Sequence, residues 1–192
     1  EINRLRNRLV EEGGTGFSVL RARADLAAWR DDFLALEHSG WKGREGTSLA
    51  ASTADAAFFA AALEHAFDAG SLEFYRLDAK GRPIAMLVNF IAGGEGYSFK
   101  IAYDEAFSRF SPGVLMELDV LKALEAYPGL KFVDSCARAD HPMINSLWEG
   151  RRAVTGLNVN AAGSAHRALL ETCRGVETLR AKLRASSGGG RS

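Results

Sequence analysis

The stretch Leu72–Tyr103, LEFYRLDAKGRPIAMLVNFIAGGEGYSFKIAY, contains three strand-like runs separated by two short turns. The runs cover residues 72–77, 83–91 and 96–103, and the residues between them include Gly81, Gly93 and Gly94. Such short, glycine-containing connections join neighbouring antiparallel strands. The stretch therefore predicts an antiparallel meander.

Helical and strand patterns flank this meander on both sides. Apolar residues recur at helical spacing after Asp25, which we expect to cap a helix, and again after Ser52 and Ser111. The spacing predicts strands over 17–22, 130–136 and 152–160, and helices over 25–38, 52–70, 112–127, 143–148 and 164–183. This order predicts a mixed α/β fold whose central sheet is mostly antiparallel and carries helices on both faces.

Both ends of the chain differ in composition from this region. Apolar residues at helical spacing among arginines predict a helix over 1–14, a connector from a missing upstream domain. Because the chain opens with Glu1 rather than methionine, we expect a piece of a longer protein. The main domain is predicted over 15–184, and a serine- and glycine-rich flexible tail over 185–192.

The composition is that of an ordinary globular protein. Of the 192 residues, 24 are Lys or Arg and 24 are Asp or Glu, so no excess of positive charge favours nucleic acid. No apolar run approaches the roughly 18 residues that cross a bilayer. Cys136 and Cys173 are too few for a disulfide scaffold, which leads us to expect a cytoplasmic protein with reduced thiols.

The segment Arg109-Phe110-Ser111-Pro112-Gly113 leads from a predicted strand into a helix. A helix start presents unpaired amides, Gly113 allows close approach of an anion such as a pyrophosphate, and Arg109 adds a cation. The alternative is a tight turn in which Ser111 caps the helix and Pro112 occupies its first position.

Several other chemistries lack their motifs. Ser111 lies outside a Gly-x-Ser-x-Gly elbow, and neither a Gly-x-Gly-x-x-Gly nor a Gly-Lys-Ser/Thr loop occurs. Cys136 falls in an apolar predicted strand, where a buried, inert thiol is the commoner case. The histidines have no partners at metal-ligand spacing, so no metal is predicted.

Two further segments carry candidate residues. Trp41-Lys42-Gly43-Arg44 is predicted as a loop with an aromatic ring and two cations, able to cover an anionic or sugar-like acceptor, or else as a surface loop anchored by a buried Trp41. Asp140-His141-Pro142 offers a pair that titrates near neutral pH, or else a helix cap.

Several motifs occur together in one order. They are Gly40-Trp41-Lys42-Gly43 with Gly46-Thr47, Phe99-Lys100 with Tyr103-Asp104-Glu105, Phe110-Ser111-Pro112-Gly113, and Asp134 ahead of Asp140-His141 and Trp148. Together they resemble acetyltransferase domains of the BioF2-like, FemAB-related branch of the GNAT superfamily, over about residues 29–159, and the element order matches.

The resemblance implies transfer of an acyl group from acetyl-CoA or another acyl-CoA to an amine on a small molecule, saccharide or peptide. In some FemAB relatives the donor is an aminoacyl-tRNA. The family places the pyrophosphate on the loop before the third helix, which here includes Arg109, Ser111 and Gly113. Pro112 and Val114 stand where the family usually has glycine or alanine, so the loop departs from the pattern.

The resemblance also indicates catalytic and acceptor-binding residues. Asp134 and Tyr103 are the candidates for base and proton donor, and Asp104 for a base or an orienting group. Lys100 faces either the cleft or solvent. The acceptor candidates are Trp41, Lys42, Lys100, His141 and Trp148. The alternative function is a non-catalytic binding or assembly module of polysaccharide or cell-envelope synthesis on the same fold.

Overall fold

The computed structural model describes residues 1–155 and 168–179, which fall into two units, Glu1–Gly150 and Arg151–Ser192. In the second unit, residues 168–179 are helical. The first unit contains the helices α1 (Ile2–Glu11), α2 (Leu26–Ser39), α3 (Trp41–Arg44), α4 (Thr53–Asp68), α5 (Pro112–Glu125) and α6 (Pro142–Leu147), and the strands β1 (Gly14–Val19), β2 (Leu72–Ala79), β3 (Arg82–Ala92), β4 (Glu95–Tyr103) and β5 (Phe132–Asp134).

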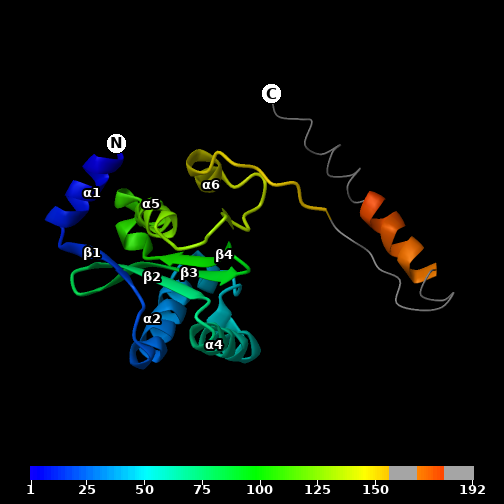
Figure 1. Cartoon of the computed structure of the whole chain (residues 1–192), viewed down its shortest axis with the longest axis horizontal. Coiled ribbons are helices and arrows are strands. Elements are labelled where there is room, and N and C mark those ends of the chain that lie inside the picture. Colours follow the sequence, from blue (N-terminus) through cyan, green and yellow to red (C-terminus); the bar gives the residue numbers. More distant parts are fainter. Residues whose placement is uncertain (156–167, 180–192) are drawn as a thin grey trace. The chain divides into compact units, whose positions relative to one another are not determined.

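The five strands form one sheet in the order β1-β2-β3-β4-β5 (Figure 1). The first four strands pair antiparallel, and β5 pairs with β4 in parallel. A parallel neighbour requires a crossover connection, and α5 provides it. The predicted sheet, mixed and mostly antiparallel, is confirmed.

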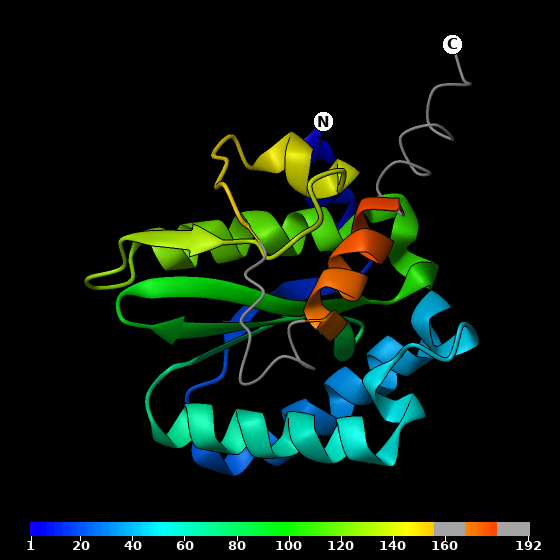
Figure 2. The ribbon, with the colours of Figure 1, turned by 90° about the vertical axis from the view of Figure 1, so that its right-hand side faces the viewer.

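Helices cover both faces of this sheet, as Figures 1 and 2 show for α2 and α4 on one side and α5 on the other. Alternate residues of a strand point to opposite faces. Met86 and Val88 accordingly pack in the core with α2 and α4, whereas Leu87 packs in the core with α5. Leu9 of α1 joins the second of these cores and is 3% exposed.

Strand β4 contains a bulge. Its Lys100 pairs with Val88 and its Ser98 with Asn89, which leaves Phe99 without a partner on β3. A bulge interrupts the alternation of a strand. Phe99 therefore stacks on a phenylalanine of α4, and Lys100 also points to the α2 side of the sheet.

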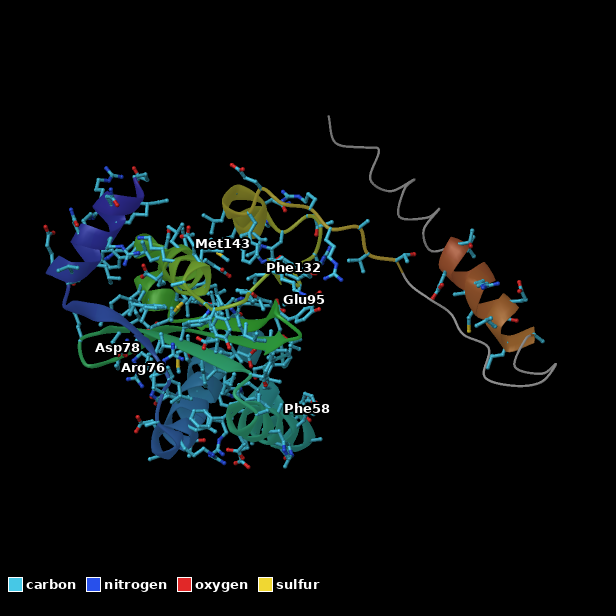
Figure 3. The ribbon with its side chains drawn as sticks, viewed as in Figure 1. Phe58, Arg76, Asp78, Glu95, Phe132 and Met143 are labelled. Atoms are coloured by element: carbon cyan, nitrogen blue, oxygen red, sulfur yellow. The ribbon has the colours of Figure 1, made fainter. Side chains whose placement is uncertain are left out.

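Strands β4 and β5 pair over only three residues. Glu95, Gly96 and Tyr97 lie opposite 132–134, and β4 then continues to Tyr103 without a described neighbour on that edge. Figure 3 labels Glu95 and Phe132 at the start of this short pairing. A Cβ on Gly96 would lie 3.2 Å from the Val133 side chain, so glycine suits this close approach.

Several predicted bounds are wrong at the edges of the sheet. The strand predicted over 17–22 runs over 14–19, because its pairing with β2 extends back to Gly14 and Ala79. The strand predicted over 130–136 is limited to 132–134, because β4 and β5 separate. Residues 152–155 form no strand, and the rest of the strand predicted over 152–160 lies outside the described residues.

The predicted helix starts had mixed outcomes. The helix predicted after Ser52 is present as α4, and the Ser52 side chain caps it by accepting a hydrogen bond from the Asp55 amide. Asp25 makes no side-chain cap bond, because it already has helical dihedrals as the last residue of a 3-10 turn. The segment predicted as a loop at Trp41 instead forms the single turn α3. Of the last predicted helix, residues 168–179 are helical and the rest lies outside the described part.

Candidate functional site

A small pocket lies where α2, α3 and the end of β4 meet. Its lining includes Glu37 of α2, Trp41 and Lys42 of α3, Tyr103 of β4, and Glu105 just beyond β4. The bulge in β4 and the short turn α3 therefore bring together side chains that are far apart in the sequence.

Glu37 is the buried centre of this pocket. Its carboxylate is 1% exposed, and its Oε1 accepts from Lys100 Nζ at 2.9 Å and from Lys42 Nζ at 3.2 Å. Its Oε2 accepts the amide of Leu49 at 2.8 Å. Burial raises the pKa of Glu37, but the Leu49 amide, Lys100 and Lys42 outweigh burial and hold it below its usual value. Glu37 is therefore ionised at neutral pH.

Lys42 also reaches the open edge of β4. Its Nζ donates to the backbone carbonyl of Ile101 at 3.2 Å. The carbonyls of a strand alternate in direction, and since Asp104 N donates to Ile84 of β3, the Ile101 carbonyl points away from β3. Lys42 thus occupies one hydrogen-bonding position on the edge that β5 leaves open.

The turn α3 is held in place by Glu105 and Gly43. Glu105 accepts from the Trp41 amide at 2.8 Å and from Arg44 at 2.9 Å. A Cβ on Gly43 would lie 1.7 Å from the carbonyl oxygen of His38, so only glycine permits this close contact with the end of α2.

The Trp41 side chain is exposed. The residue is 45% accessible, and Lys42 Nζ lies 5.9 Å from its ring centroid. Trp41 therefore does not anchor the segment as a buried residue would, and its ring remains available for contact with a ligand.

Helix α5 begins beside the same strand end. Ser111 has left-handed dihedrals and makes no side-chain cap bond, Pro112 occupies the first turn, and Gly113 is buried. A Cβ on Gly113 would lie 3.6 Å from Met143 Sδ and 3.9 Å from Tyr103 Cδ1. Tyr103 thus borders both the pocket and the start of α5. Met143, labelled in Figure 3, comes from α6.

Arg109 and Val114 are also predicted to bind an anion at the start of α5. Arg109 forms an ion pair with Glu12 at 2.8 Å, and its guanidinium lies 4.6 Å from the Phe110 ring centroid. The pKa of Glu12 is lowered chiefly by its hydrogen bond with Lys80, and in addition by the charge of Arg109. Val114 is half-buried. In this conformation Arg109 is directed to the end of α1.

Two predicted carboxylates have structural partners. Asp104 accepts the amide of Ala106 as a cap at 2.9 Å and pairs with Arg82 at 2.5 Å. Asp134, half-buried at the end of β5, accepts the Cys136 amide at 2.8 Å. The strand ends before Cys136, whose left-handed dihedrals and exposed side chain correct the expectation of a buried thiol.

Helix α6 carries the remaining candidates. His141 Nδ1 accepts the Ile144 amide at 3.3 Å and so caps the helix. Asp140 pairs with Arg138 instead of His141. Trp148 is half-buried near Glu117 of α5, whose carboxyl is buried. The hydrogen bond of the His141 ring and the ion pair of Asp140 are thus made within residues 138–144, and not with the cluster around Glu37.

Comparison with known proteins identifies the family of the chain. The model of the acetyltransferase (GNAT) domain family matches residues 1–141. The chain belongs to the GNAT acetyltransferase family. Members of this family move an acyl group from acyl-CoA to an amine, and the chain is accordingly an acyl-CoA-dependent acyltransferase. No protein of curated function matches the sequence significantly.

Solved structures share the fold of this GNAT domain. An aminoglycoside acetyltransferase from an uncultured soil sample, in complex with sisomicin, has a TM-score of 0.55 at 11% identity, with 77% of this chain and 96% of that chain covered. An aminoglycoside 6'-N-acetyltransferase from Acinetobacter haemolyticus has a TM-score of 0.52 at 14% identity, with 78% of this chain and 100% of that chain covered. A possible acetyltransferase from Clostridium difficile has a TM-score of 0.51 at 10% identity, with 74% of this chain and 97% of that chain covered.

Sequence reasoning missed three carboxylates of this GNAT domain, namely Glu37, Glu105 and Glu117. Glu37 follows Phe33 and Leu36 on the apolar stripe of its helix, and a carboxylate there was the available signal. Glu117 likewise lies on the buried side of α5. The partners of all three come from elsewhere in the chain, so their roles needed the tertiary structure.

Residues 1–155 and 168–179 contain no group of three His, Cys, Asp or Glu side chains arranged to hold a metal ion. None of their helices is long and apolar enough to span a membrane.

Proposed function

We propose that this GNAT domain is an N-acetyltransferase whose acceptor amine binds in the pocket around Glu37 and Trp41. The observation that carries the proposal is the open edge of β4. That edge runs from the point where β5 separates to Tyr103, which borders both the pocket and the start of α5. A donor along this edge would meet an acceptor in the pocket at Tyr103.

The start of α5 supports the donor side of the proposal. A 14-residue helix directs unpaired amides and the positive end of its dipole toward a phosphate. Pro112 removes one of these amides, so the amides of Gly113 and Val114, with Ser111, are the groups proposed for the pyrophosphate of acetyl-CoA. Arg109 joins them by exchanging its ion pair with Glu12, which is exposed and therefore weak.

Acyl transfer needs a neutral amine and a proton for the departing thiolate. We assign the proton donor to Tyr103. Asp134 pairs with Tyr97, six residues along β4 from Tyr103, which is about 20 Å at 3.3 Å per residue, so it is outside hydrogen-bond reach of an amine held at Tyr103 and is not assigned as the base. Glu37 is unsuited as a base, because two lysines stabilise its ionised form. Asp104, tied to Arg82, keeps the end of β4 in place.

Wider assignments rest on the sequence motifs. We place the domain in the FemAB-related branch, with an amine on a small molecule, saccharide or peptide as acceptor. The exposed thiols of Cys136 and Cys173 fit a reducing compartment such as the cytoplasm. The exposed apolar side chains of Ile2 and Val10 on α1 fit contact with an upstream domain.

The donor is tested by calorimetric titration with acetyl-CoA. Wild type and Gly113→Ala should bind, because a Cβ there meets only ordinary contacts of 3.6–3.9 Å. Gly113→Val should bind at least about tenfold more weakly, since its branched methyls crowd Met143, Tyr103 and the space for the phosphate. Absence of binding by the folded wild type at millimolar acetyl-CoA would overturn the donor assignment.

The catalytic assignment is tested by turnover of two variants. Tyr103→Phe should lower kcat while preserving the ring, because its hydroxyl is the proposed proton donor. Asp134→Asn should leave kcat unchanged, because Asp134 lies at the far end of the open edge. Normal turnover of Tyr103→Phe would overturn the assignment of Tyr103, and a roughly hundredfold loss in Asp134→Asn would place the base there instead.

A further inference from the structure

The charged side chains that meet at Glu37 carry more positive than negative charge. Lys42, which lines the pocket, and Lys100, which lies beside it, both donate to the same oxygen, Oε1 of Glu37. One carboxylate therefore faces two ammonium groups, and this cluster carries one uncompensated positive charge. Glu105, the other carboxylate of the pocket lining, is paired with Arg44.

Both lysines retain donor capacity. An ammonium group has three N–H donors. Among the described residues, Lys42 donates to Glu37 and Ile101, and Lys100 only to Glu37. Their side chains are 23% and 24% exposed, so the unused donors are partly desolvated yet accessible, with Lys42 in the pocket lining and Lys100 beside it. A charge in such a place interacts more strongly with a ligand than one on the open surface.

The surroundings favour an acceptor with a polar, charged end and a flat or sugar-like body. The exposed ring of Trp41 lies on one side of the pocket, and Tyr103 lies toward the proposed donor edge. Positive charge beside the pocket also favours the neutral form of an acceptor amine, which is the reactive form.

We infer that the acceptor is an amine that also carries an anionic group, a carboxylate or a phosphate, bound by Lys42 and Lys100. This inference rests on the proposed function of the pocket. In the reaction the amine nitrogen forms a bond to the thioester carbonyl carbon, the carbon–sulfur bond breaks, and the amine loses a proton. The thiolate leaves with the electron pair and becomes the thiol. A polycationic aminoglycoside such as sisomicin is repelled by the same charge.

The experiment compares matched amines with acetyl-CoA as donor, following thiol release. The pairs are glucosamine 6-phosphate with glucosamine, which tests phosphate, and β-alanine with β-alaninamide, which tests carboxylate; sisomicin serves as the polycation. Each amine is also titrated calorimetrically into the full chain. The test variant is Lys42→Gln, whose amide can still donate to the Ile101 carbonyl. The matched control is Lys122→Gln, at an exposed position of α5.

We expect an anionic member to have a KM or Kd at least about tenfold below that of its neutral partner, the range of a charge-assisted hydrogen bond. Lys42→Gln should remove most of this difference, whereas Lys122→Gln should keep it. Circular dichroism verifies that both variants fold.

The possible failures separate the inference from the function. Equal or better use of the neutral amines or sisomicin overturns the anionic acceptor and leaves the acetyltransferase in place. If acetyl-CoA binds but no amine is acetylated, calorimetry decides: absence of binding by the anionic amines at millimolar concentration overturns the inference. Absence of acetyl-CoA binding overturns the proposed function, and the inference with it.

Discussion

Two buried glutamates show how neighbours decide the ionisation of identical side chains. Glu37 and Glu117 are both 3% exposed. Two lysines and an amide hold Glu37 ionised. Burial raises the pKa of Glu117 to about 7, and the Trp148 indole offsets this only in part. The first carboxylate orders a charged pocket, whereas the second is a pH-dependent group in the core beneath α5.

The raised pKa of Glu117 predicts that the free energy of unfolding falls as the pH rises. In the native state Glu117 retains its proton up to about pH 7, whereas in the unfolded chain it loses the proton near 4.5, the ordinary pKa of a glutamate. Native protein thus binds more protons between these values, and the free energy of unfolding decreases as pH rises through that window. Glutamine has no proton to lose, so Glu117→Gln should not show this decrease. At pH 8 its free energy of unfolding should exceed that of wild type by at most about 3 kcal/mol.

Urea unfolding of wild type and Glu117→Gln at pH 5 and pH 8 measures this difference. The two proteins should diverge at pH 8 and approach each other at pH 5. Parallel changes in both proteins would show that Glu117 does not titrate in the native state over this range.

Among the elements, α3 has the greatest influence on the pocket relative to its length. Its four residues supply Trp41 and Lys42, and three contacts hold it: the Glu105 carboxylate on Trp41 N and Arg44, and the packing of Gly43 on the end of α2. An isolated helical turn is unstable in water. The tertiary contacts therefore stabilise α3 as a helical turn.

Gly43→Ala should displace α3. The new Cβ would lie 1.7 Å from the His38 carbonyl oxygen, which belongs to the backbone and cannot move aside cheaply. We expect a loss of roughly 1–3 kcal/mol in unfolding free energy and a raised acceptor KM. Gly150→Ala is the control, because a Cβ there has nothing within 4 Å. Equal Tm values for the two variants would contradict the proposed packing of Gly43.

At the scale of the molecule, the described core residues all lie within the first unit. One core cluster draws on α1, α5 and the sheet, and the other on α2, α4 and the sheet. The last buried apolar residue of the described part is Ile144. In the described part of the second unit, Leu169, Val176 and Leu179 are exposed. The first unit therefore has what an independently folding domain needs.

A chain ending at Gly150 should fold by itself. We expect its unfolding free energy to lie within about 1 kcal/mol of that of the full chain, with acetyl-CoA affinity retained. Chemical unfolding and calorimetry of the two proteins check this. A large loss of either would show that residues 151–192 contribute to the domain, as the sequence-based boundary at residue 184 predicts.

The sequence by itself determined the meander of 72–103, the helices at Ser52 and Ser111 and the resemblance to GNAT acetyltransferases. These features depend on local periodicity, turn residues and caps, which are encoded within a few neighbouring residues. The candidates Lys100, Tyr103, Trp41 and Lys42 came from the same motifs. That Trp41, Lys42 and Tyr103 line one pocket, and that Lys100 pairs with Glu37 beside them, is a property of the folded chain.

Only the tertiary structure decided which charges meet. The Glu37 carboxylate and Lys100 are separated by 63 positions in the chain, and the bulge at Phe99 turns Lys100 toward α2. The exposure of Trp41 and the short pairing of β4 with β5 depend likewise on contacts between distant segments. Local sequence patterns predict the elements, but the partner of a buried charge is set by long-range packing, because desolvation and pairing act only once the elements have assembled.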